Sequence, residues 1–458
     1  MNEGRAISTA ELLPRVGRWR AGEPGLGGTV DEDASALARY AAAGEELAAQ
    51  LPAKPDRGEP EQRLGDLVFE SCRRVRNRFI RRHADEVYDA LTDVRSTHLR
   101  LSELVFCAAE RYPGLVPTRA QIEAEREHIQ AHKDGREIDQ GIFFRGVLRS
   151  PVAGAHLVDG MLLPSPRAVA SLAEFRRTAR LDLDTVLVER RGHAAHLTVH
   201  NEHCLNAEDN QLVSDMETAI DLALLDEQVR VGVLRGGVMT HPSYLGRRVF
   251  NAGINLTDLH DGAISFVDFF LGRELGCIGK LVHGLLIDPA DDAWPDRMIQ
   301  KPWVAAVDSF AIGGGMQLLL AFDHVVAAED AYFSLPAAQE GIVPGLSNLR
   351  LGRFTGSRLG RRIILSGRKI RATDPEAPLL CDEVVPPADV DAAVDRAVRN
   401  MDKPAVVANR RMLNLAEEPF DLLRAYLAEF AVNQARRMYS RDVLDKVERQ
   451  WSLPRART

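Results

Sequence analysis

The stretch Ser309–Asp323, SFAIGGGMQLLLAFD, places three consecutive glycines between a short apolar run and a run of leucines. A second stretch, Phe250–Leu256 (FNAGINL), passes from hydrophobic sequence into an Ala-Gly turn. Each glycine at a helix start costs about 1 kcal/mol relative to alanine. Such a run is therefore favoured where the backbone approaches a ligand and points N–H groups at it. Tight helix–strand packing is the alternative explanation. Together, the two stretches predict a site built from backbone N–H groups.

The residues around these stretches alternate between strand and helix patterns. Val229, Val231 and Val233 alternate as a strand, and the apolar residues of Glu208–Gln228 mark one face of a helix. Further strands are expected in TVLVER, HAAHLTVHN, Trp303–Val307 and His324–Ala328, and a buried helix over Gly314–Phe322. Strands followed by helices in this order predict an α/β core with a mostly parallel sheet covered by helices.

The chain of 458 residues is too long for one ordinary core, and its pattern divides it into three parts. Residues 1–180 are expected to form a helical N-terminal domain, 181–388 the α/β core with the active site, and 389–458 C-terminal helices. The helical runs expected in the first part are Ala34–Leu51, Leu64–Thr92, Leu99–Arg111, Arg119–Lys133 and Pro166–Arg180. In the last part, Leu427, Phe430, Ala431 and Ala435 share one helical face, which predicts packing on another element or on a neighbouring subunit.

Composition excludes several classes of function. A net charge of −8 gives no reason to expect nucleic acid as a partner, and the basic run Arg73–Arg82 fits a solvated helix face better. No stretch approaches the roughly 20 apolar residues that a membrane span needs, and the N-terminus does not resemble a secretory signal. Five scattered cysteines without a CxxC pair favour reduced thiols and a cytoplasmic protein.

The sequence holds no motif for a metal or an organic cofactor. GCIGKL lacks the glycine spacing of a phosphate loop, and no GxGxxG follows a strand. His128 and His132 lie four residues apart, but HIQAH lacks the glutamate of a zinc-protease motif. The spacing of His196, His200 and His203 is not diagnostic. We therefore expect neither a metal site nor a bound cofactor.

From about Thr185 to Val385 the sequence resembles the crotonase (enoyl-CoA hydratase/isomerase) superfamily. The matching motifs are LNAEDNQL, VRVGVLRGG, FNAGINL, KPWVAAVDSFAIGGGMQLLLAFDHVVAAEDAYFSLP and EGIVPG. The resemblance implies a spiral of ββα units and an acyl-CoA substrate. It also implies that the N–H groups of Ile254 and Gly314 form an oxyanion hole for the thioester oxygen. Each preorganised donor of this kind can contribute roughly 3 kcal/mol of barrier lowering.

Two departures from the family pattern point away from hydration. The positions of the two hydratase glutamates hold Gln317 and Ala337, and neither side chain is a general acid or base. With the long helical N-terminal part and HPSYLGRRVFNAGINLTDLHDG, the chain resembles a branch that oxidises a dihydroxyphenylacetyl-CoA thioester in glycopeptide antibiotic biosynthesis. That resemblance implies O2 as co-substrate, no metal or other cofactor, an arylglyoxylate and free CoA as products, and a homotrimer or hexamer.

A ring with two hydroxyls needs polar partners, which directs attention to the residues beside the hole. Arg273 is the first candidate, although a surface salt bridge would explain it equally well. Glu208 follows the Asn-Ala of LNAE, and a first-turn acid that favours the helix dipole is its alternative explanation. Gln317 is expected to face the hole. Arg248 or Arg247 could meet the CoA phosphates, although surface exposure would explain both arginines equally well. Glu340 is a weaker candidate, for which a cap or ion pair is the simpler explanation.

Two other readings stay open at this point. Another crotonase-type enzyme, such as an isomerase, decarboxylase or thioester hydrolase, would share the oxyanion hole. A catalytically idle CoA-binding scaffold would also fit the loss of both glutamates. Oxygen uptake matched to CoA release separates the three.

Overall fold

The computed structural model describes residues 9–288, 294 and 297–452, and the chain divides into two compact units. Unit 1 comprises Met1–Leu157, Asp261–Ala263 and Leu427–Ser440, and unit 2 comprises Val158–His260, Ile264–Tyr426 and Arg441–Thr458. The three-part division at residues 180 and 388 stays a prediction, since compactness does not show which parts fold independently.

Unit 2 is built on a seven-stranded sheet in the order β1-β2-β3-β4-β7-β9-β12. Its strands are β1 (Arg180–Leu183), β2 (Val186–Arg191), β3 (Ala194–Val199), β4 (Val231–Gly236), β7 (Trp303–Val307), β9 (His324–Ala328) and β12 (Glu383–Val385). The pairings from β3 to β12 are parallel, and β1, β2 and β3 pair antiparallel. The mostly parallel α/β core predicted from the sequence is confirmed.

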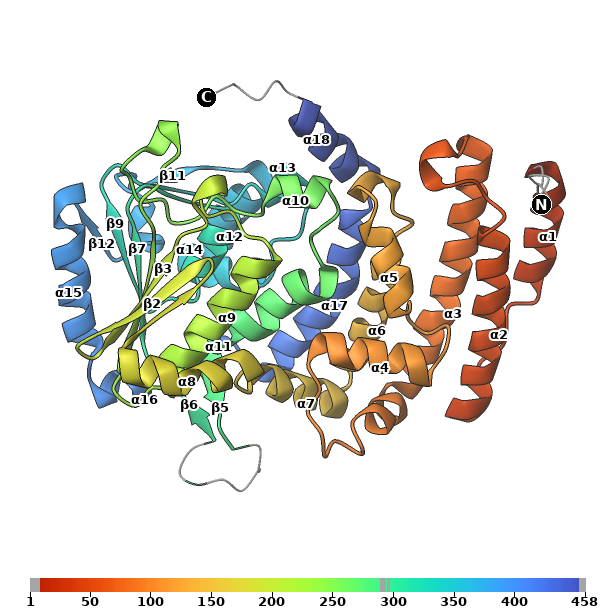
Figure 1. Cartoon of the computed structure of the whole chain (residues 1–458), viewed down its shortest axis with the longest axis horizontal. Coiled ribbons are helices and arrows are strands. Elements are labelled where there is room, and N and C mark those ends of the chain that lie inside the picture. The colour runs from red at the N-terminus through yellow and green to blue at the C-terminus, as the bar shows by residue number, and fades with distance from the viewer. Residues whose placement is uncertain (1–8, 289–293, 295–296, 453–458) are drawn as a thin grey trace. The chain divides into compact units, whose positions relative to one another are not determined.

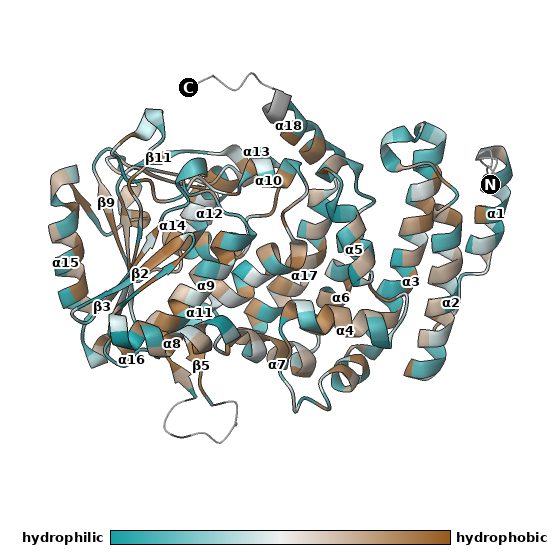
Figure 2. Cartoon of the chain, in the orientation of Figure 1, coloured by the Kyte–Doolittle hydropathy of each residue, from teal (hydrophilic) through white to brown (hydrophobic). Residues whose placement is uncertain are grey.

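Helices cover this sheet, as buried parallel strands require. α9 (Asn210–Leu225) packs on β2, and α15 (Val390–Met401) packs on β4, β7, β9 and β12. Figure 1 shows these two helices on opposite sides of the sheet. β7 is buried along its whole length, and Figure 2 shows the hydrophobic colour running along the strands. Aliphatic side chains therefore fill both faces of the sheet.

A second, three-stranded sheet leads into the glycine-rich stretch. It pairs β8 (Phe310–Ile312) with β10 (Tyr332–Ser334) in parallel and β10 with β11 (Ile370–Arg371) antiparallel. α12 (Gly314–Leu319) follows β8 after one residue. Its start agrees with the predicted helix, but it ends earlier than Phe322. β5 (Leu285–Leu286) and β6 (Met298–Ile299) form a separate hairpin.

Between β4 and β5 the chain forms α10 (Leu256–His260), two π-helical segments, η5 (Phe266–Leu271) and η6 (Arg273–Ile278), and α11 (Gly279–His283). π-helical turns are rare and occur frequently at functional sites. Since hydrophobic periodicity assumes 3.6 residues per turn, it does not reveal these wider turns.

Unit 1 is helical. Its helices are α1 (Thr9–Ala21), α2 (Val30–Ala48), α3 (Glu59–Leu91), α4 (Leu101–Arg111), α5 (Arg119–Arg126), α6 (Glu137–Arg149) and most of α7 (Pro151–Leu162), joined by Leu427–Ser440 from α17 (Phe420–Met438). The expected helix Arg119–Lys133 is too long, because α5 ends at Arg126. The sequence pattern missed α6, because buried residues occupy nearly all of its sides and leave no amphipathic stripe.

The predicted apolar face of the C-terminal helix is covered inside the chain. Leu427, Ala431 and Ala435 are fully buried, and the backbone of Ala431 lies against Gly141 of α6. A neighbouring subunit is therefore not needed to explain this face.

The remaining helices belong to unit 2 or to turns. They are α8 (Pro166–Thr178), α13 (Ala337–Glu340), α14 (Ser347–Ser366), α16 (Pro404–Glu417), α18 (Arg441–Ser452) and the 3₁₀ turns η1 (Lys54–Asp56), η2 (Gln130–His132), η3 (Glu202–Cys204), η4 (Pro242–Tyr244), η7 (Ala377–Leu379) and η8 (Pro387–Asp389). Within the described ranges, no helix has the length and apolar character that crossing a membrane requires.

Candidate active site

The two stretches that open the sequence argument lie side by side in unit 2. Asn251 forms a parallel bridge with Ala311, and its carbonyl accepts the Ile312 N–H at 3.0 Å. The Asn251 side chain closes an Asx turn, because its Oδ1 accepts the Gly253 N–H at 2.7 Å. One asparagine thus joins both backbone segments.

Two glycines allow this close approach. Gly253 has φ +91° and Gly313 φ +52°, values that side-chain-bearing residues rarely adopt. A Cβ on Gly313 would lie 3.3 Å from the Gly253 Cα, and one on Gly253 would lie 3.8 Å from the Gly314 nitrogen. The segments carrying Ile254 and Gly314 therefore meet backbone to backbone.

The geometry leaves the N–H groups of Ile254 and Gly314 available. Glu208 and Ile254 form a parallel bridge in which Glu208 makes both hydrogen bonds. The Glu208 N–H donates to the Gly253 carbonyl at 2.6 Å, and the Glu208 carbonyl accepts the Asn255 N–H at 2.8 Å. The N–H of Ile254 therefore points to the opposite side. Gly314 begins α12, where N–H groups have no partner inside the helix.

A buried ion pair contacts the Gly314 segment. Arg273 Nε and Nη2 donate to the two carboxylate oxygens of Glu208 at 2.7 and 3.1 Å. Nη2 also donates to the Gly314 carbonyl at 2.8 Å. Burial lowers the pKa of Arg273, but the charges of Glu208 and then Glu274 outweigh it, so the pKa is raised. The surface salt bridge considered for Arg273 is wrong, because only 4% of the residue is exposed.

All five N–H hydrogens of Arg273 have protein acceptors. Nη1 donates to Glu274 Oε1 at 2.8 Å and to Gln317 Oε1 at 3.2 Å, in addition to the three bonds above. A guanidinium carries five donors and no acceptor. Arg273 in this arrangement positions its neighbours and has no donor left for a ligand.

This pairing fixes the orientation of Gln317. Because arginine only donates, the amide oxygen of Gln317 must face Arg273 and its NH2 group must face the other way. That NH2 group donates to none of the residues that the structure describes. Its two donors are therefore not used by the described part of the chain.

Glu274 is a member of this cluster that the sequence argument missed. Its Oε2 accepts the Leu346 N–H at 3.0 Å, and a Cβ on Gly345 would clash with its carboxylate. Tyr426 donates to the Gly345 carbonyl at 2.7 Å. The EGIVPG segment is thus fixed to Arg273 through Glu274. The only signal for Glu274 in the sequence was its position directly after Arg273.

The other candidates lie apart from this cluster. Arg248 Nη1 donates to the Gly236 carbonyl at 3.1 Å, and no described contact joins it to Glu208 or Arg273. Arg247 pairs with Asp330 at 2.5 Å and is exposed. Glu340 pairs with Lys446 at 2.6 Å, so the ion pair favoured by the sequence is present. Ala337 is buried at the start of α13.

No group of three or more His, Cys, Asp or Glu side chains suited to a metal ion occurs among the residues with described positions. Burial lowers the pKa of His196 to about 4, so this histidine is neutral near pH 7. The buried cluster of charged side chains consists of Glu208, Arg273 and Glu274.

Comparison with known proteins places this geometry in a family. Residues 291–433 match the enoyl-CoA hydratase/isomerase family. The chain is 57% identical over 415 residues to the (3,5-dihydroxyphenyl)acetyl-CoA 1,2-dioxygenase of Amycolatopsis orientalis, covering 91% of this chain and 95% of that one. It is 26% identical over 211 residues to the short-chain-enoyl-CoA hydratase of Clostridium acetobutylicum, covering 46% and 72%.

Among solved structures, OdaA of Pseudomonas aeruginosa aligns with a TM-score of 0.48 at 24% identity, covering 59% of this chain and 99% of that one. The family match and the extended similarity to the Amycolatopsis protein agree with the motifs of the sequence. The chain belongs to the enoyl-CoA hydratase/isomerase, or crotonase, family.

Proposed function

We propose that this chain is a dioxygenase that converts 3,5-dihydroxyphenylacetyl-CoA and O2 to 3,5-dihydroxyphenylglyoxylate and CoA, without a metal or organic cofactor. The observation that carries the proposal is that Gln317 and Ala337 occupy the positions where the family resemblance expects the two hydratase acids. The similarity to the Amycolatopsis dioxygenase over nearly the whole chain supports the substrate. Its place in glycopeptide antibiotic biosynthesis, in the supply of dihydroxyphenylglycine, is part of the same proposal.

The proposed chemistry starts from the oxyanion hole. The N–H groups of Ile254 and Gly314 stabilise negative charge on the thioester oxygen, so loss of an α-proton gives an enolate conjugated with the ring. The enolate gives an electron to O2, and recombination forms an α-peroxide. Attack of the peroxide on the thioester carbonyl expels CoA, and cleavage of the O–O bond leaves the α-ketone and the carboxylate.

The proposed reaction balances without an external reductant. Oxidation of the α-CH2 to a ketone with loss of the thioester bond takes up both atoms of one O2. One hydrogen of the CH2 group ends on the CoA thiol and the other is released or stays on the acid. The substrate itself is therefore the only reductant that the proposal requires.

The protein residues have distinct parts in this proposal. Gln317, whose NH2 group faces away from Arg273, donates to the bound substrate or peroxide. Glu208 and Arg273 belong to the substrate site as the charged wall behind the hole, with Arg273 positioning Gln317 and the Gly314 carbonyl. Arg248 contacts the CoA moiety.

An oxygen electrode tests the proposal directly. EDTA-treated protein is given 3,5-dihydroxyphenylacetyl-CoA while O2 uptake and free thiol are followed together. Equal O2 uptake and CoA release support the dioxygenase. Thiol release that continues without O2 identifies a thioester hydrolase, and no change in either identifies a scaffold. Gln317→Ala should lower turnover more than thioester affinity, and unchanged turnover would remove Gln317 from the site.

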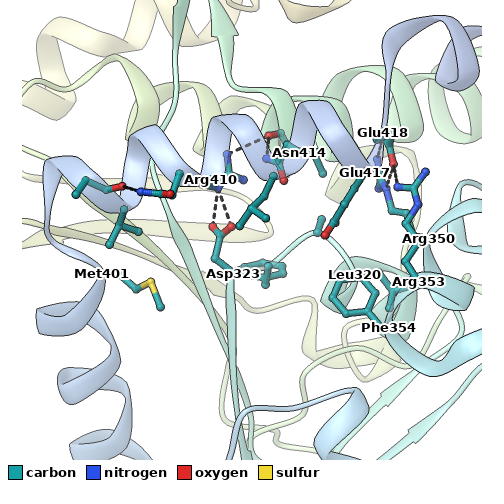
Figure 3. Close-up of a pocket in the computed structure, with 17 residues that line it drawn as sticks. Leu320, Asp323, Arg350, Arg353, Phe354, Met401, Arg410, Asn414, Glu417 and Glu418 are labelled. Carbon is teal, nitrogen blue, oxygen red and sulfur yellow. Dashed lines mark hydrogen bonds and ion pairs between the residues drawn. The ribbon is translucent and has the colours of Figure 1, made fainter.

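We also propose a homotrimer or hexamer, with the exposed face of α16 in the interface. Met412, Leu413 and Leu415 are 61%, 59% and 52% exposed, which is unusual for neighbouring large apolar residues. Of these three residues, Leu413 lines a cavity of about 490 Å³ between α14 and α16. Figure 3 shows Phe354, Met401 and Leu320 around it. The cytoplasm is the proposed location, on the cysteine pattern of the sequence.

Light scattering tests this interface. Leu413→Asp should shift the particle to a smaller mass, because a charge is placed in an apolar contact. Val169→Asp is the matched control, since Val169 is 59% exposed on α8. A mass that changes equally in both variants, or in neither, would contradict the assignment of α16.

A further inference from the structure

Unit 1 includes three residues of the connection between α10 and η5, Asp261–Ala263. In the middle of this connection, the Gly262 carbonyl accepts a hydrogen bond from Nζ of Lys133, which is 3% exposed. Gly262 has φ +72°, and a Cβ there would lie 2.5 Å from the His128 carbonyl oxygen and 2.6 Å from Lys133 Cε. The segment around Lys133 therefore encloses Gly262 closely.

Burying a lysine side chain at this position has an unfavourable desolvation free energy. Burial lowers the pKa of Lys133, and the charges of Glu137 and Glu125 oppose that change. An apolar side chain would fill the space without the desolvation of an ammonium group. What only a cation supplies is a charge-assisted hydrogen bond to the carbonyl of the left-handed residue.

The segment that carries Lys133 is itself held firmly. The Glu125 carboxylate accepts the N–H groups of Asp134 and Arg136 at 2.8 and 3.1 Å. Arg57 pairs with Asp134 at 2.6 Å, and Arg73 donates to the Gly135 carbonyl at 2.8 Å. Lys133 is therefore a fixed point from which the Gly262 carbonyl can be positioned.

The connection joins two segments of the candidate active site, one that carries Ile254 and one that carries Arg273. Upstream of Gly262, α10 begins two residues after Ile254, whose N–H group is one of the proposed oxyanion donors. Downstream, Ser265 begins the π-helical run that carries Arg273, and its N–H donates to Asn210 Oδ1 at 3.0 Å. A shift of Gly262 would be transmitted along the chain to both of these segments.

We propose that Lys133 is a positioning residue for the active site, acting through the Gly262 carbonyl to hold the Ile254 and Arg273 segments in their catalytic geometry. This inference rests on the proposed dioxygenase function for its kinetic readout. It gives the helical N-terminal part of the chain a role in the reaction through one buried hydrogen bond.

Lys133→Met removes the hydrogen bond, and Lys133→Gln keeps a shorter, neutral donor. The matched control is Lys301→Met. Lys301 is also buried, and its Nζ donates to the Ala223 and Asp226 carbonyls at 2.8 and 2.7 Å, away from the connection. Each full-length variant is measured for melting temperature, kcat, KM and O2 consumed per CoA released. Hydrogen exchange by mass spectrometry is followed in peptides covering residues 254–273.

Lys133→Met should lower kcat about tenfold with KM changed little, because small misplacements of catalytic groups act on the chemical step. It should also lower the ratio of O2 to CoA below one and speed exchange in 254–273, with Lys133→Gln intermediate. Lys301→Met should lose stability without these changes. Equal behaviour of Lys133→Met and Lys301→Met would overturn the inference. The exchange measurement needs no substrate, so it decides the role of Lys133 even if the wild type takes up no O2, a result that would refute the proposed function alone.

Discussion

Replacing Gly314 with alanine tests whether the proposed oxyanion hole and the buried ion pair form one unit. A Cβ at this position would lie 2.3 Å from Oε2 and 2.7 Å from Cδ of Glu208, closer than real Cβ atoms approach. Glu208 has no easy way to move, because Arg273 holds both of its carboxylate oxygens and Asn251 donates to one of them at 3.0 Å. The added methyl group must therefore displace α12 or break the ion pair.

Both outcomes are measurable. Overpacking of this kind costs about 1–3 kcal/mol of unfolding free energy, and loss of one oxyanion donor costs roughly 10²- to 10³-fold in kcat. Urea unfolding and oxygen uptake with the aryl-acetyl-CoA thioester give the two values. Gly352→Ala is the control, since no atom lies within 4 Å of its Cβ on α14. It should be neutral or slightly stabilising and leave kcat unchanged.

A double-variant cycle identifies the cause. If the clash is with Glu208, the alanine at 314 should destabilise a Glu208→Ala protein by about 1 kcal/mol less than it destabilises the wild type, since contacting residues are not additive. Equal costs in both backgrounds, or full turnover by Gly314→Ala, would refute the argument that Gly314 is glycine because Glu208 lies behind it.

Three further predictions concern buried charges and the exposure of the cysteines. Arg273→Lys replaces five donors with three, so it should lower the unfolding free energy by about 3 kcal/mol. The control Arg297→Lys, in a partly exposed pair with Asp159, should change the unfolding free energy by less than about 1 kcal/mol. Similar losses in the two variants would contradict the five-bond arrangement of Arg273. Burial raises the pKa of Glu125 from 4.5 to about 7, so the unfolding free energy should fall by about 3 kcal/mol as pH rises from 4.5 to 7. In urea titrations at several pH values, Glu125→Gln should flatten this dependence of the unfolding free energy on pH. An unchanged dependence would show that other groups cause it. Cys107 is exposed whereas Cys72, Cys277 and Cys381 are buried, so Cys107→Ser should abolish the fast phase of thiol titration in the native protein. A persisting fast phase would point to Cys204.

The close backbone approach of the two glycine-containing segments was predictable, whereas their role as a site of N–H donors stays a prediction. Gly253 and Gly313 adopt left-handed or otherwise restricted conformations, and Gly314 and Gly315 have no space for a side chain. Three glycines in a row before an apolar helix signal this need without any knowledge of the fold. The parallel sheet was also predictable, since alternating apolar strands and helices leave few other arrangements.

The ion pair was not predictable from pattern, although both of its members were selected as candidates. Glu208 and Arg273 are 65 residues apart in the sequence, and only the fold decides that the two side chains meet. The π-helical turns add to the difficulty, because Arg273 follows an apolar run that reads as an ordinary helix with an exposed cation. Glu274 was missed for the same reason, since an acid beside an arginine on a helix is usually solvated.

Gln317 illustrates what the fold adds to a residue that the sequence did identify. The sequence says only that an amide replaces a carboxylic acid near the hole, which removes a proton donor and acceptor from the site. The contact with Arg273 determines the direction of that amide, because the guanidinium accepts nothing and so selects the oxygen. A glutamate at 317 would meet the same arginine as a third carboxylate beside Glu208 and Glu274 and present no donor to a ligand. In the proposed function, the glutamine therefore offers an N–H group where a hydratase acid would activate water, and Arg273 fixes the direction of that group.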